Sequence, residues 1–267
     1  MAEGIHTFVI PAYQNSPFLE ECIISLQKQT IPSQIIITTS TPSLFLFGIA
    51  KNYNIEISIN KNFNNISEDW NFAYQQCQTK YLTLAHQDDI YLPEYTEKCL
   101  HVAENSKNQE NLIIFTDYAE LLINRRRRIS FVLLVKKMLL IPFIIKNSIE
   151  NHFLKKIILS LGNPISCPTV MFNKENIGEF KFSEDYIYNL DWDAWIQLIR
   201  VNGKFIYINK KLMLHRLHPE SQTHIQIKNK NRIVEEEIIF RKLWLSPVAK
   251  LLISIYKFGG KFNLHDH

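Results

Sequence analysis

Glycine is scarce in this chain, with only 7 residues in 267. None of them forms a GxGxxG or GxxxxGK[S/T] loop after an apolar run. Dinucleotide-binding dehydrogenases and P-loop enzymes use such loops to bring backbone amides against phosphates, so the sequence argues against both classes. If this protein binds a phosphate, a metal ion held by carboxylates must neutralise most of its charge.

Paired cysteines and long apolar runs are also missing. The four cysteines lie far apart with no CxxC pair, which predicts reduced core residues of a cytosolic protein and no zinc site. The most apolar stretch, residues 129–145, is interrupted by Lys136, Lys137 and Pro142. It is shorter than the roughly 20 clean apolar residues of a membrane-spanning helix. The amino terminus shows no secretory signal, so we expect a cytoplasmic protein.

The composition is that of an ordinary globular protein, with 46% hydrophobic and 21% charged residues. The net charge of +4 is mild, and we expect no nucleic-acid partner. The charge is unevenly placed, however, because Arg125 to Arg128 are consecutive and an apolar stretch follows them directly.

Apolar runs and amphipathic segments alternate along the first 117 residues. The pattern predicts strands at 7–11, 34–39, 55–59, 81–85 and 112–117, and helices at 18–28, 43–53, 67–78 and 93–104. Ser16 with Pro17, and Ser67 or Asp69, are the predicted amino-terminal caps of the first and third helices. Strands that alternate with helices of this length indicate an α/β protein with a doubly wound, mostly parallel sheet and helices on both faces.

Two adjacent carboxylates, Asp88 and Asp89, directly follow the predicted strand at 81–85. Ligands of open α/β sheets bind at the carboxyl ends of the strands, and carboxylate oxygens there suit Mg²⁺ or Mn²⁺ carrying a phosphate. The alternative interpretation is a polar turn, since Asp is a common turn former. The pair alone leaves both interpretations open.

Five short motifs, in order, resemble family 2 glycosyltransferases of the GT-A fold, the type that builds bacterial cell-surface polysaccharides. Residues 8–15 (FVIPAYQN) resemble the family's first strand and turn, and residues 86–89 (HQDD) its variant DxD motif. The others are Trp70-Asn71, residues 190–195 (LDWDAW) and residues 215–219 (HRLHP). The resemblance implies a GT-A domain at 1–225, with a helical insertion at about 118–162, and a helical extension at 226–267.

The resemblance also assigns roles to individual residues. Asp89 and His218 would hold Mn²⁺ or Mg²⁺, Asp88 would lie near the ribose or sugar, and Asp191 would be the catalytic base. Donor binding would involve Pro11, Ala12, Tyr13, Thr38, Trp70, Asn71, Asp88 and Arg216.

Each of these assignments has a purely structural alternative. Asp191 and Asp193 can both serve the start of a helix, where carboxylates are favoured. His218 can be an ordinary surface residue. Arg216 can cover apolar surface instead of pairing with phosphate.

The chain departs from the family pattern at three positions. Thr38-Thr39-Ser40 stand where the family usually ends its second strand with an Asp pair, Trp70 replaces a frequent arginine, and Leu190 replaces the Glu before the base. These positions are the ones expected to contact the base and sugar of the donor. The expectation of a UDP-sugar therefore rests only on how frequently the family uses UDP. Family members that polymerise processively carry Gln-x-x-Arg-Trp and membrane helices. This chain has neither, which favours a single addition.

The segment at 118–162 combines basic and apolar residues and fits the fold least well. It can lie in an anionic membrane interface, or it can form an insertion that packs over the acceptor cleft with its arginines in solvent. Residues 243–258 form a second candidate surface. An interfacial position would make the acceptor a lipid-linked glycan and the protein peripheral on the inner face of a membrane.

The predicted function is that of a metal-dependent, inverting glycosyltransferase acting on a nucleotide-diphosphate sugar and a glycan or lipid-linked acceptor. One alternative is a catalytically silent sugar-nucleotide-binding or scaffold protein of the same fold. The other is a nucleotidyltransferase, although residues 12–15 (AYQN) do not form the glycine-rich basic loop that such enzymes need.

Overall fold

The computed structural model describes residues 4–62, 65–106, 110–122, 125–127, 131–218 and 231–263. Arg128 of the arginine run lies outside these residues. Within them the chain forms strands β1 (His6–Ala12), β2 (Gln34–Thr39), β3 (Glu56–Ile59), β4 (Tyr81–Leu84), β5 (Ile90–Tyr91), β6 (Asn111–Leu122), β7 (Arg125–Arg127), β8 (Ser148–Ile149), β9 (Val170–Asn173) and β10 (Lys204–Arg216).

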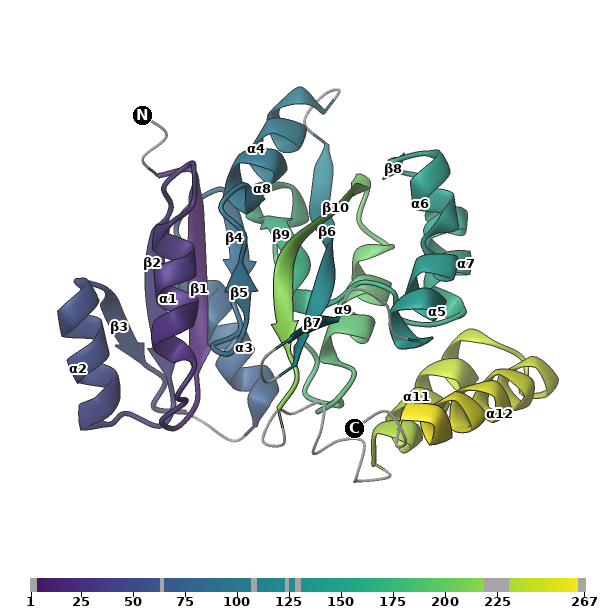
Figure 1. The fold of residues 1–267 in the computed structure, drawn as a ribbon. Helices are drawn as coiled ribbons and strands as arrows, with labels where there is room; N and C mark the ends of the chain where they lie inside the picture. Colours follow the sequence, from purple (N-terminus) through teal and green to yellow (C-terminus); the bar gives the residue numbers. More distant parts are fainter. Residues whose placement is uncertain are drawn as a thin grey trace.

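The helices surround these strands on both sides, as Figure 1 shows. They are α1 (Leu19–Gln27), α2 (Leu44–Tyr53), α3 (Ile66–Gln76), α4 (Tyr95–Asn105), α5 (Phe131–Leu139), α6 (Ile141–Ile145), α7 (His152–Ser160), η2 (Cys167–Thr169), α8 (Lys174–Ile177), α9 (Leu190–Leu198), α11 (Asn231–Leu243) and α12 (Ser246–Asn263). Every strand and helix predicted for the first 117 residues is present. None of the described helices is long and apolar enough to cross a membrane.

The described strands form one sheet in the order β3-β2-β1-β4-β9-β6-β10-β5, with β7 paired to β6 and β8 to β10. The half made by β3, β2, β1 and β4 is parallel throughout, as is the β6–β10 ladder. The α/β prediction is therefore confirmed. The strand β9 was not predicted, and it lies antiparallel between β4 and β6.

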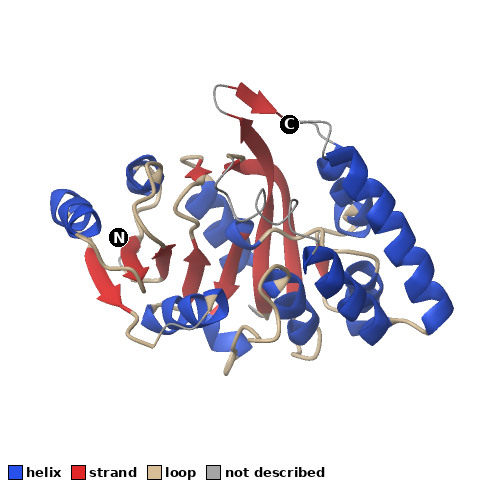
Figure 2. Ribbon diagram, turned by 90° about the horizontal axis from the view of Figure 1, so that it is seen from below, coloured by secondary structure: helices blue, strands red, loops and turns tan. Residues whose placement is uncertain are grey.

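Two hydrophobic cores lie on opposite faces of the sheet, because successive side chains of a strand point to opposite sides. In β1, Phe8 and Ile10 pack with buried residues of α1, α2 and α4. Val9 faces the other way and joins the core formed with α3, α7, α9 and the carboxy-terminal helices. Figure 2, seen from below, shows these helices on the two sides of the twisted sheet.

Two of the predicted helix caps are wrong. The helix α1 begins after Phe18 without a side-chain cap, and the Ser16 hydroxyl accepts a bond from the Phe18 amide at 3.3 Å instead. Asn65 caps α3 by accepting from the Glu68 amide at 3.0 Å, so neither Ser67 nor Asp69 has this role. Asn is as good a cap as Ser or Asp, and composition alone does not select among neighbouring candidates.

Aromatic side chains join the end of the insertion helix α7 to α9 and to the carboxy-terminal helices. The end of α7 exposes carbonyl groups that have no partner in the helix. The indole nitrogen of Trp192 donates to the Leu159 carbonyl at 2.8 Å, and that of Trp244 donates to the Ser160 carbonyl at 2.7 Å. The Tyr256 hydroxyl donates to the Leu161 carbonyl at 3.3 Å. Trp192 of α9, Trp244 after the end of α11, and Tyr256 of α12 therefore complete the end of one insertion helix.

The four cysteines are buried and unpaired, as expected for reduced core residues. Cys22 donates from its thiol to the His86 carbonyl at 3.3 Å. Burial is the main cause that raises the pKa of Cys22, and the Asp89 carboxylate adds to it. The protonated thiol therefore serves as a donor beneath the loop that follows β4.

His6, at the start of β1, provides a test of the packing by titration. It is 2% exposed, and its ring nitrogens lie 2.8 Å from the Ser33 hydroxyl and 3.0 Å from the Thr83 hydroxyl. Burial lowers its pKa from 6.5 to about 3. Between these values the unfolded chain binds a proton that the folded chain does not, so stability is lost as the pH falls.

We expect this residue to contribute a loss of about 2–3 kcal/mol in the free energy of unfolding between pH 6.5 and 4.5. Urea unfolding of His6→Gln should show a correspondingly smaller loss over this range. The matched control His101→Gln removes an exposed histidine and should keep the wild-type dependence. An equally steep loss in His6→Gln and wild type would show that His6 is not buried as a neutral ring.

Candidate active site

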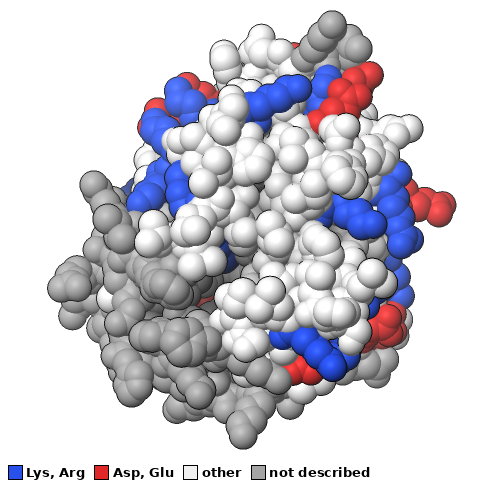
Figure 3. All heavy atoms as spheres, turned by 90° about the vertical axis from the view of Figure 1, so that its right-hand side faces the viewer, with Lys and Arg blue, Asp and Glu red and all other residues white. Residues whose placement is uncertain are grey.

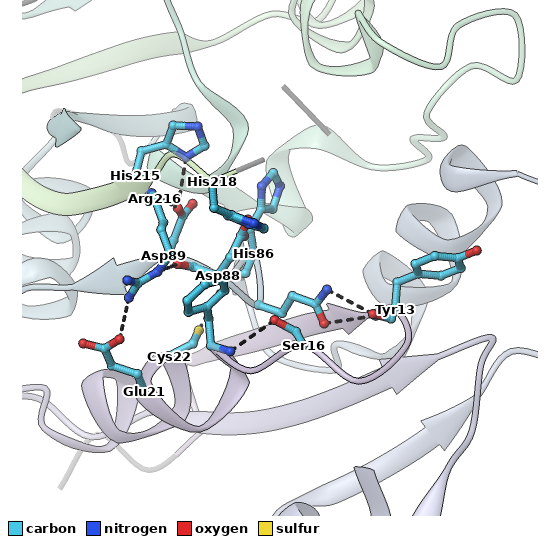
Figure 4. Close-up of polar contacts among 12 residues, drawn as sticks. Tyr13, Ser16, Glu21, Cys22, His86, Asp88, Asp89, His215, Arg216 and His218 are labelled. Atoms are coloured by element: carbon cyan, nitrogen blue, oxygen red, sulfur yellow. Dashed lines mark hydrogen bonds and ion pairs between the residues drawn. The ribbon is translucent and has the colours of Figure 1, made fainter. Parts of the chain in front are cut away.

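A tight turn after β4 gathers three metal-ligand side chains. The Asp89 amide donates to the His86 carbonyl at 3.1 Å, which folds residues 86–89 back on themselves. As a result His86, Asp88 and Asp89 each offer one ligand atom, and these atoms all lie within 4.8 Å of one another. Figure 4 shows the group at the end of β4, in front of α1. Of the residues singled out as metal ligands from the sequence, Asp89 belongs to this group and His218 does not.

Asp89 is fully buried, and only one of its oxygens is satisfied by the protein. Its Oδ1 accepts from the Arg216 amide at 2.9 Å and lies 3.0 Å from Nδ1 of His215. Its Oδ2 has no hydrogen-bond partner within the protein, and neither has the buried Nε2 of His86. A buried carboxylate oxygen and an imidazole nitrogen without partners fit a divalent cation, because both donate lone pairs to Mn²⁺ or Mg²⁺.

The end of β10 supplies the partners of the two aspartates. The strand β5, which directly follows Asp89, pairs antiparallel with β10, with Leu214 opposite Ile90. This pairing brings Arg216 and the residues after it beside the loop. His218 lies with its Nε2 3.0 Å from Oδ2 of Asp88. His215, Arg216 and His218 are therefore fixed beside a loop that lies 126 to 130 residues earlier in the chain.

Arg216 is used inside the protein. Its Nε donates to the Asp88 carbonyl at 2.9 Å, and its terminal nitrogen forms an ion pair with Glu21 of α1. Its guanidinium group also lies 4.4 Å from the centre of the Phe18 ring. Arg216 therefore links β10, the aspartate loop and α1, and it adds positive charge beside the group.

The histidines and aspartates shift one another's protonation. Burial raises the pKa of Asp88, but the hydrogen bond from His218 and the charges of His86 and His215 hold it below its ordinary value. Burial lowers the pKa of His215, and the adjacent Asp89 carboxylate outweighs this and raises it. The arrangement favours an ionised Asp88 together with a protonated His215, which donates to Asp89.

The end of β1 lies beside the same loop. The side-chain amide of Gln87 forms two hydrogen bonds with the backbone of Tyr13, each 3.1 Å long (Figure 4). Its oxygen accepts from the Tyr13 amide, and its nitrogen donates to the Tyr13 carbonyl. The Tyr13 side chain is 41% exposed and points away from the aspartates. Pro11 and Ala12 precede it at the carboxyl end of β1. The Gln87 side chain therefore links the end of β1 to the loop after β4.

The end of β2 carries Thr38, whose buried hydroxyl has no hydrogen-bond partner within the protein. Two residues further on, Ser40 donates from its hydroxyl to Asp69 of α3 at 2.7 Å. Asn60 donates to the other oxygen of Asp69 at 2.8 Å. A carboxylate thus lies beside the end of β2, although β2 itself carries none. The sequence indicated Asp69 only as a helix cap.

The two residues singled out on α3 differ in their surroundings. The rings of Trp70 and His86 have centroids 5.2 Å apart, so Trp70 reaches the group at the end of β4. The Asn71 side chain instead exchanges hydrogen bonds of 3.0 and 2.7 Å with the backbone of Phe182. The described contacts therefore bring Trp70, but not Asn71, to the metal-ligand group.

The aspartates of α9 have different environments. Asp193 is 4% exposed and accepts from the Gln197 side chain at 2.7 Å. Asp191 is half-buried, and its Oδ1 accepts from the Trp192 amide at 2.8 Å. The pKa of the Cys167 thiol is raised by burial first and then by the charges of Asp191 and Asp89. The charges of Asp191 and Asp89 thus both act on the Cys167 thiol, whereas Asp193 bonds within its own helix.

Sequence reasoning missed several members of this site. His86 and His215 lie within the quoted motifs but have no assigned role. Neither Gln87 nor Glu21 was singled out. An alternating pattern cannot show that these side chains meet, since the partners of Gln87, His215 and Glu21 are 74 to 195 residues away.

The sheet and the carboxylate loop after β4 define an α/β protein with a candidate cation site at the ends of its strands. The sequence matches the family described as Glycosyl transferase family 2 over residues 7–177, more than half of the chain. The chain therefore belongs to glycosyl transferase family 2. The match ends before Asp191, so it does not cover the predicted base. No curated protein matches the chain.

Solved structures with a similar fold include two glycosyltransferases. The complex of S. aureus TarS 1–349 with UDP-GlcNAc is 14% identical, with a TM-score of 0.61, covering 88% of this chain and 65% of that one. The present chain spans 44% of the longer TarS structure. The Mycobacterium tuberculosis glucosyl-3-phosphoglycerate synthase with Mn²⁺ and UDP-glucose is 11% identical, with a TM-score of 0.58, covering 89% and 79% of the two chains. At these identities the likeness shows the fold, which confirms the GT-A prediction.

The fit of a cation to this group can be tested with Asp89→Asn. The substitution keeps an oxygen for the Arg216 amide but removes the charge and one of the two carboxylate oxygens. We expect the affinity for Mn²⁺ in the presence of UDP to fall by more than about 100-fold, because loss even of an outer partner costs 10–100-fold. Calorimetric titration measures this, with Asp185→Asn as an exposed control. Wild-type affinity in a folded Asp89→Asn would exclude Asp89 as a ligand.

Proposed function

We propose that the protein is a metal-dependent, inverting glycosyltransferase that transfers a sugar from a nucleotide-diphosphate donor. The observation that carries the proposal is the pair of buried, unpartnered ligand atoms, Oδ2 of Asp89 and Nε2 of His86, in a family 2 chain. Such groups are costly to bury unless a ligand completes them. His86, Asp88 and Asp89 would hold Mn²⁺ or Mg²⁺, and His218 would hold Asp88 in place.

The chemistry assigned to this chain is a single displacement. Asp191 takes the proton of an acceptor hydroxyl while that oxygen forms a bond to the anomeric carbon, and the bond from this carbon to the diphosphate breaks. Attack opposite the leaving group inverts the anomeric centre. When bound, the cation acts as a Lewis acid on the leaving diphosphate. Protonated His215 and Arg216 add positive charge behind Asp89 and Asp88.

The donor we propose is a UDP-sugar. Two structurally similar proteins were solved with UDP-GlcNAc and UDP-glucose, and one of these contains Mn²⁺. In this chain Tyr13 and Thr38 lie at the carboxyl ends of β1 and β2, and Asp69 of α3 lies beside the end of β2. These residues would contact the nucleoside. Pro11, Ala12 and Trp70 would form the adjoining walls. Their polar groups are uncharged apart from Asp69, so they favour hydrogen bonding to a base and ribose.

The alternatives differ in what they predict for turnover. Leu190 and Thr38 stand where the family has acidic residues, which keeps a catalytically silent sugar-nucleotide-binding protein as the second candidate. A nucleotidyltransferase would release pyrophosphate instead of a nucleoside diphosphate. A panel of nucleotide sugars with Mn²⁺, assayed for nucleoside diphosphate and for transfer, separates the three. We expect UDP release that a chelator abolishes.

The role of Asp191 is tested against its neighbour Asp193. We expect Asp191→Asn to lower kcat by about 10²–10⁴-fold, the usual contribution of a general base, and to leave the affinity for UDP and Mn²⁺ unchanged. Asp193→Asn loses a charge that helps hold Gln197 and should reduce the melting temperature more than the turnover. Equal losses of kcat in the two variants would remove Asp191 from the proposed role.

For the acceptor we propose a lipid-linked glycan of surface polysaccharide biosynthesis, presented at an anionic membrane. The helices α5 to α7 and α12 expose apolar side chains, including Met138 (60%), Phe153 (71%), Leu251 (61%) and Ile255 (56%). The Tyr256 bond to Leu161 joins α12 to the end of α7. Figure 3 shows this side of the molecule as mostly uncharged, with Lys and Arg side chains around it. Such a surface suits an anionic interface.

This surface is tested by co-sedimentation with phosphatidylglycerol vesicles and with uncharged phosphatidylcholine vesicles. We expect preferential binding to the anionic vesicles, weakened by salt and by Met138→Glu or Leu251→Glu. Leu44→Glu changes a 90% exposed leucine on α2 and should bind like wild type. If no variant differs, the insertion does not contact a membrane. The interpretation that it packs over the acceptor cleft is then preferred.

A further inference from the structure

The carboxy-terminal helix α11 is bonded directly to the start of α9. The Glu235 side chain is only 9% exposed, and its carboxylate accepts four hydrogen bonds from residues 187–189. Its Oε1 accepts from the Ile187 amide at 2.8 Å. Its Oε2 accepts from the amides of Tyr188 and Asn189, each at 2.9 Å, and from the Asn189 side chain at 3.2 Å.

These bonds occur where α9 lacks a cap of its own. The amides at the start of a helix have no intrahelical partners, and the Asn189 side chain does not cap α9. A carboxylate at this position satisfies the preceding amides, and its negative charge is favourable at the amino-terminal end of a helix. Glu235 therefore satisfies three backbone amides that lead into α9 and places a negative charge near the start of that helix.

Packing holds the other side of the same turn. The Trp192 ring is 1% exposed and lies 5.2 Å from the Phe240 ring of α11, measured between centroids. Asp191 lies between the residues that Glu235 binds and the ring that Phe240 contacts. The helix α11 thus contacts the chain on both sides of Asp191.

The other charged groups here do not replace Glu235. Arg232 pairs with Glu236 at 3.0 Å within α11, and the charge of Asp191 also contributes to the raised pKa of Arg232. Lys242 lies 3.7 Å from Asp193, which is two residues after Asp191 on α9. Among the described contacts, only Glu235 accepts from residues 187–189.

From this geometry we infer that Glu235 is a positioning residue for Asp191, so that the carboxy-terminal extension completes the active site although it lies outside the family match. The inference rests on the proposed function, because it assumes that Asp191 is the base. Its structural part, an external carboxylate that orders residues 187–191, does not depend on activity.

The test compares Glu235→Gln with wild type in the full chain. The substitution keeps the shape, but it removes the charge and turns an NH₂ group toward an amide donor. We expect kcat for transfer to fall by about 10- to 100-fold, as a misplacement of about 1 Å produces, while KM for the nucleotide sugar stays within about twofold. Hydrogen exchange should accelerate at the amides of residues 187–191 and remain unchanged in β1 and β4.

Glu184→Gln is the matched control, because Glu184 lies in the same segment but pairs with Lys181 at the surface. It should match wild type in kcat and in hydrogen exchange. Faster exchange with wild-type kcat would overturn the positioning role, and unchanged exchange would overturn the structural part. A fall in kcat that is accompanied by an equal rise in KM or by unfolding would also contradict it. If wild type transfers no sugar from any donor, the proposed function fails, while the exchange result still decides whether Glu235 orders the loop.

Discussion

The carboxylate of Asp89 is the interaction on which the site depends. It is fully buried, and removing such a charge from water costs several kcal/mol unless the protein provides compensating bonds. The compensation comes from the amide of Arg216 and the ring of His215, both at the end of β10. The strand β10 reaches this position between β6 and β5, with register shifts against β6 between Ile208 and Met213.

Much of the fold could be predicted from the sequence because its signals are local. The runs at 34–39 and 81–85 read as buried strands, and the structure contains them. The strand β9 could not be found this way, because its four residues are too few to show a pattern. Its place between β4 and β6 follows from pairing with residues about 60 to 90 positions earlier. The cap of α3 failed for a different reason, because Asn65, Ser67 and Asp69 are chemically equivalent candidates, and α1 has no side-chain cap at all.

The site was predictable to the extent that it lies within short motifs. Asp88 and Asp89 follow β4 as expected, and Trp70 contacts His86. The assignments to His218 and Asn71 illustrate the limit, because a motif identifies a residue but not its partner. His218 lies on Asp88, and Asn71 lies on the Phe182 backbone. Glu235 could not be found at all, because nothing in a mid-helix glutamate indicates that it accepts from a loop about 46 residues earlier.

Asp89 receives hydrogen bonds from residues that are synthesised much later, and this sets the order in which the site forms. The parallel strands β1, β2 and β4 can pair as soon as they emerge from the ribosome, since domains generally fold from the amino terminus onward. Oδ1 of Asp89, however, receives its backbone donor only when residue 216 is available, 127 positions later. A nascent chain therefore leaves Asp89 without this donor until β10 has been released, and residues 187–189 receive their bonds from Glu235 later still.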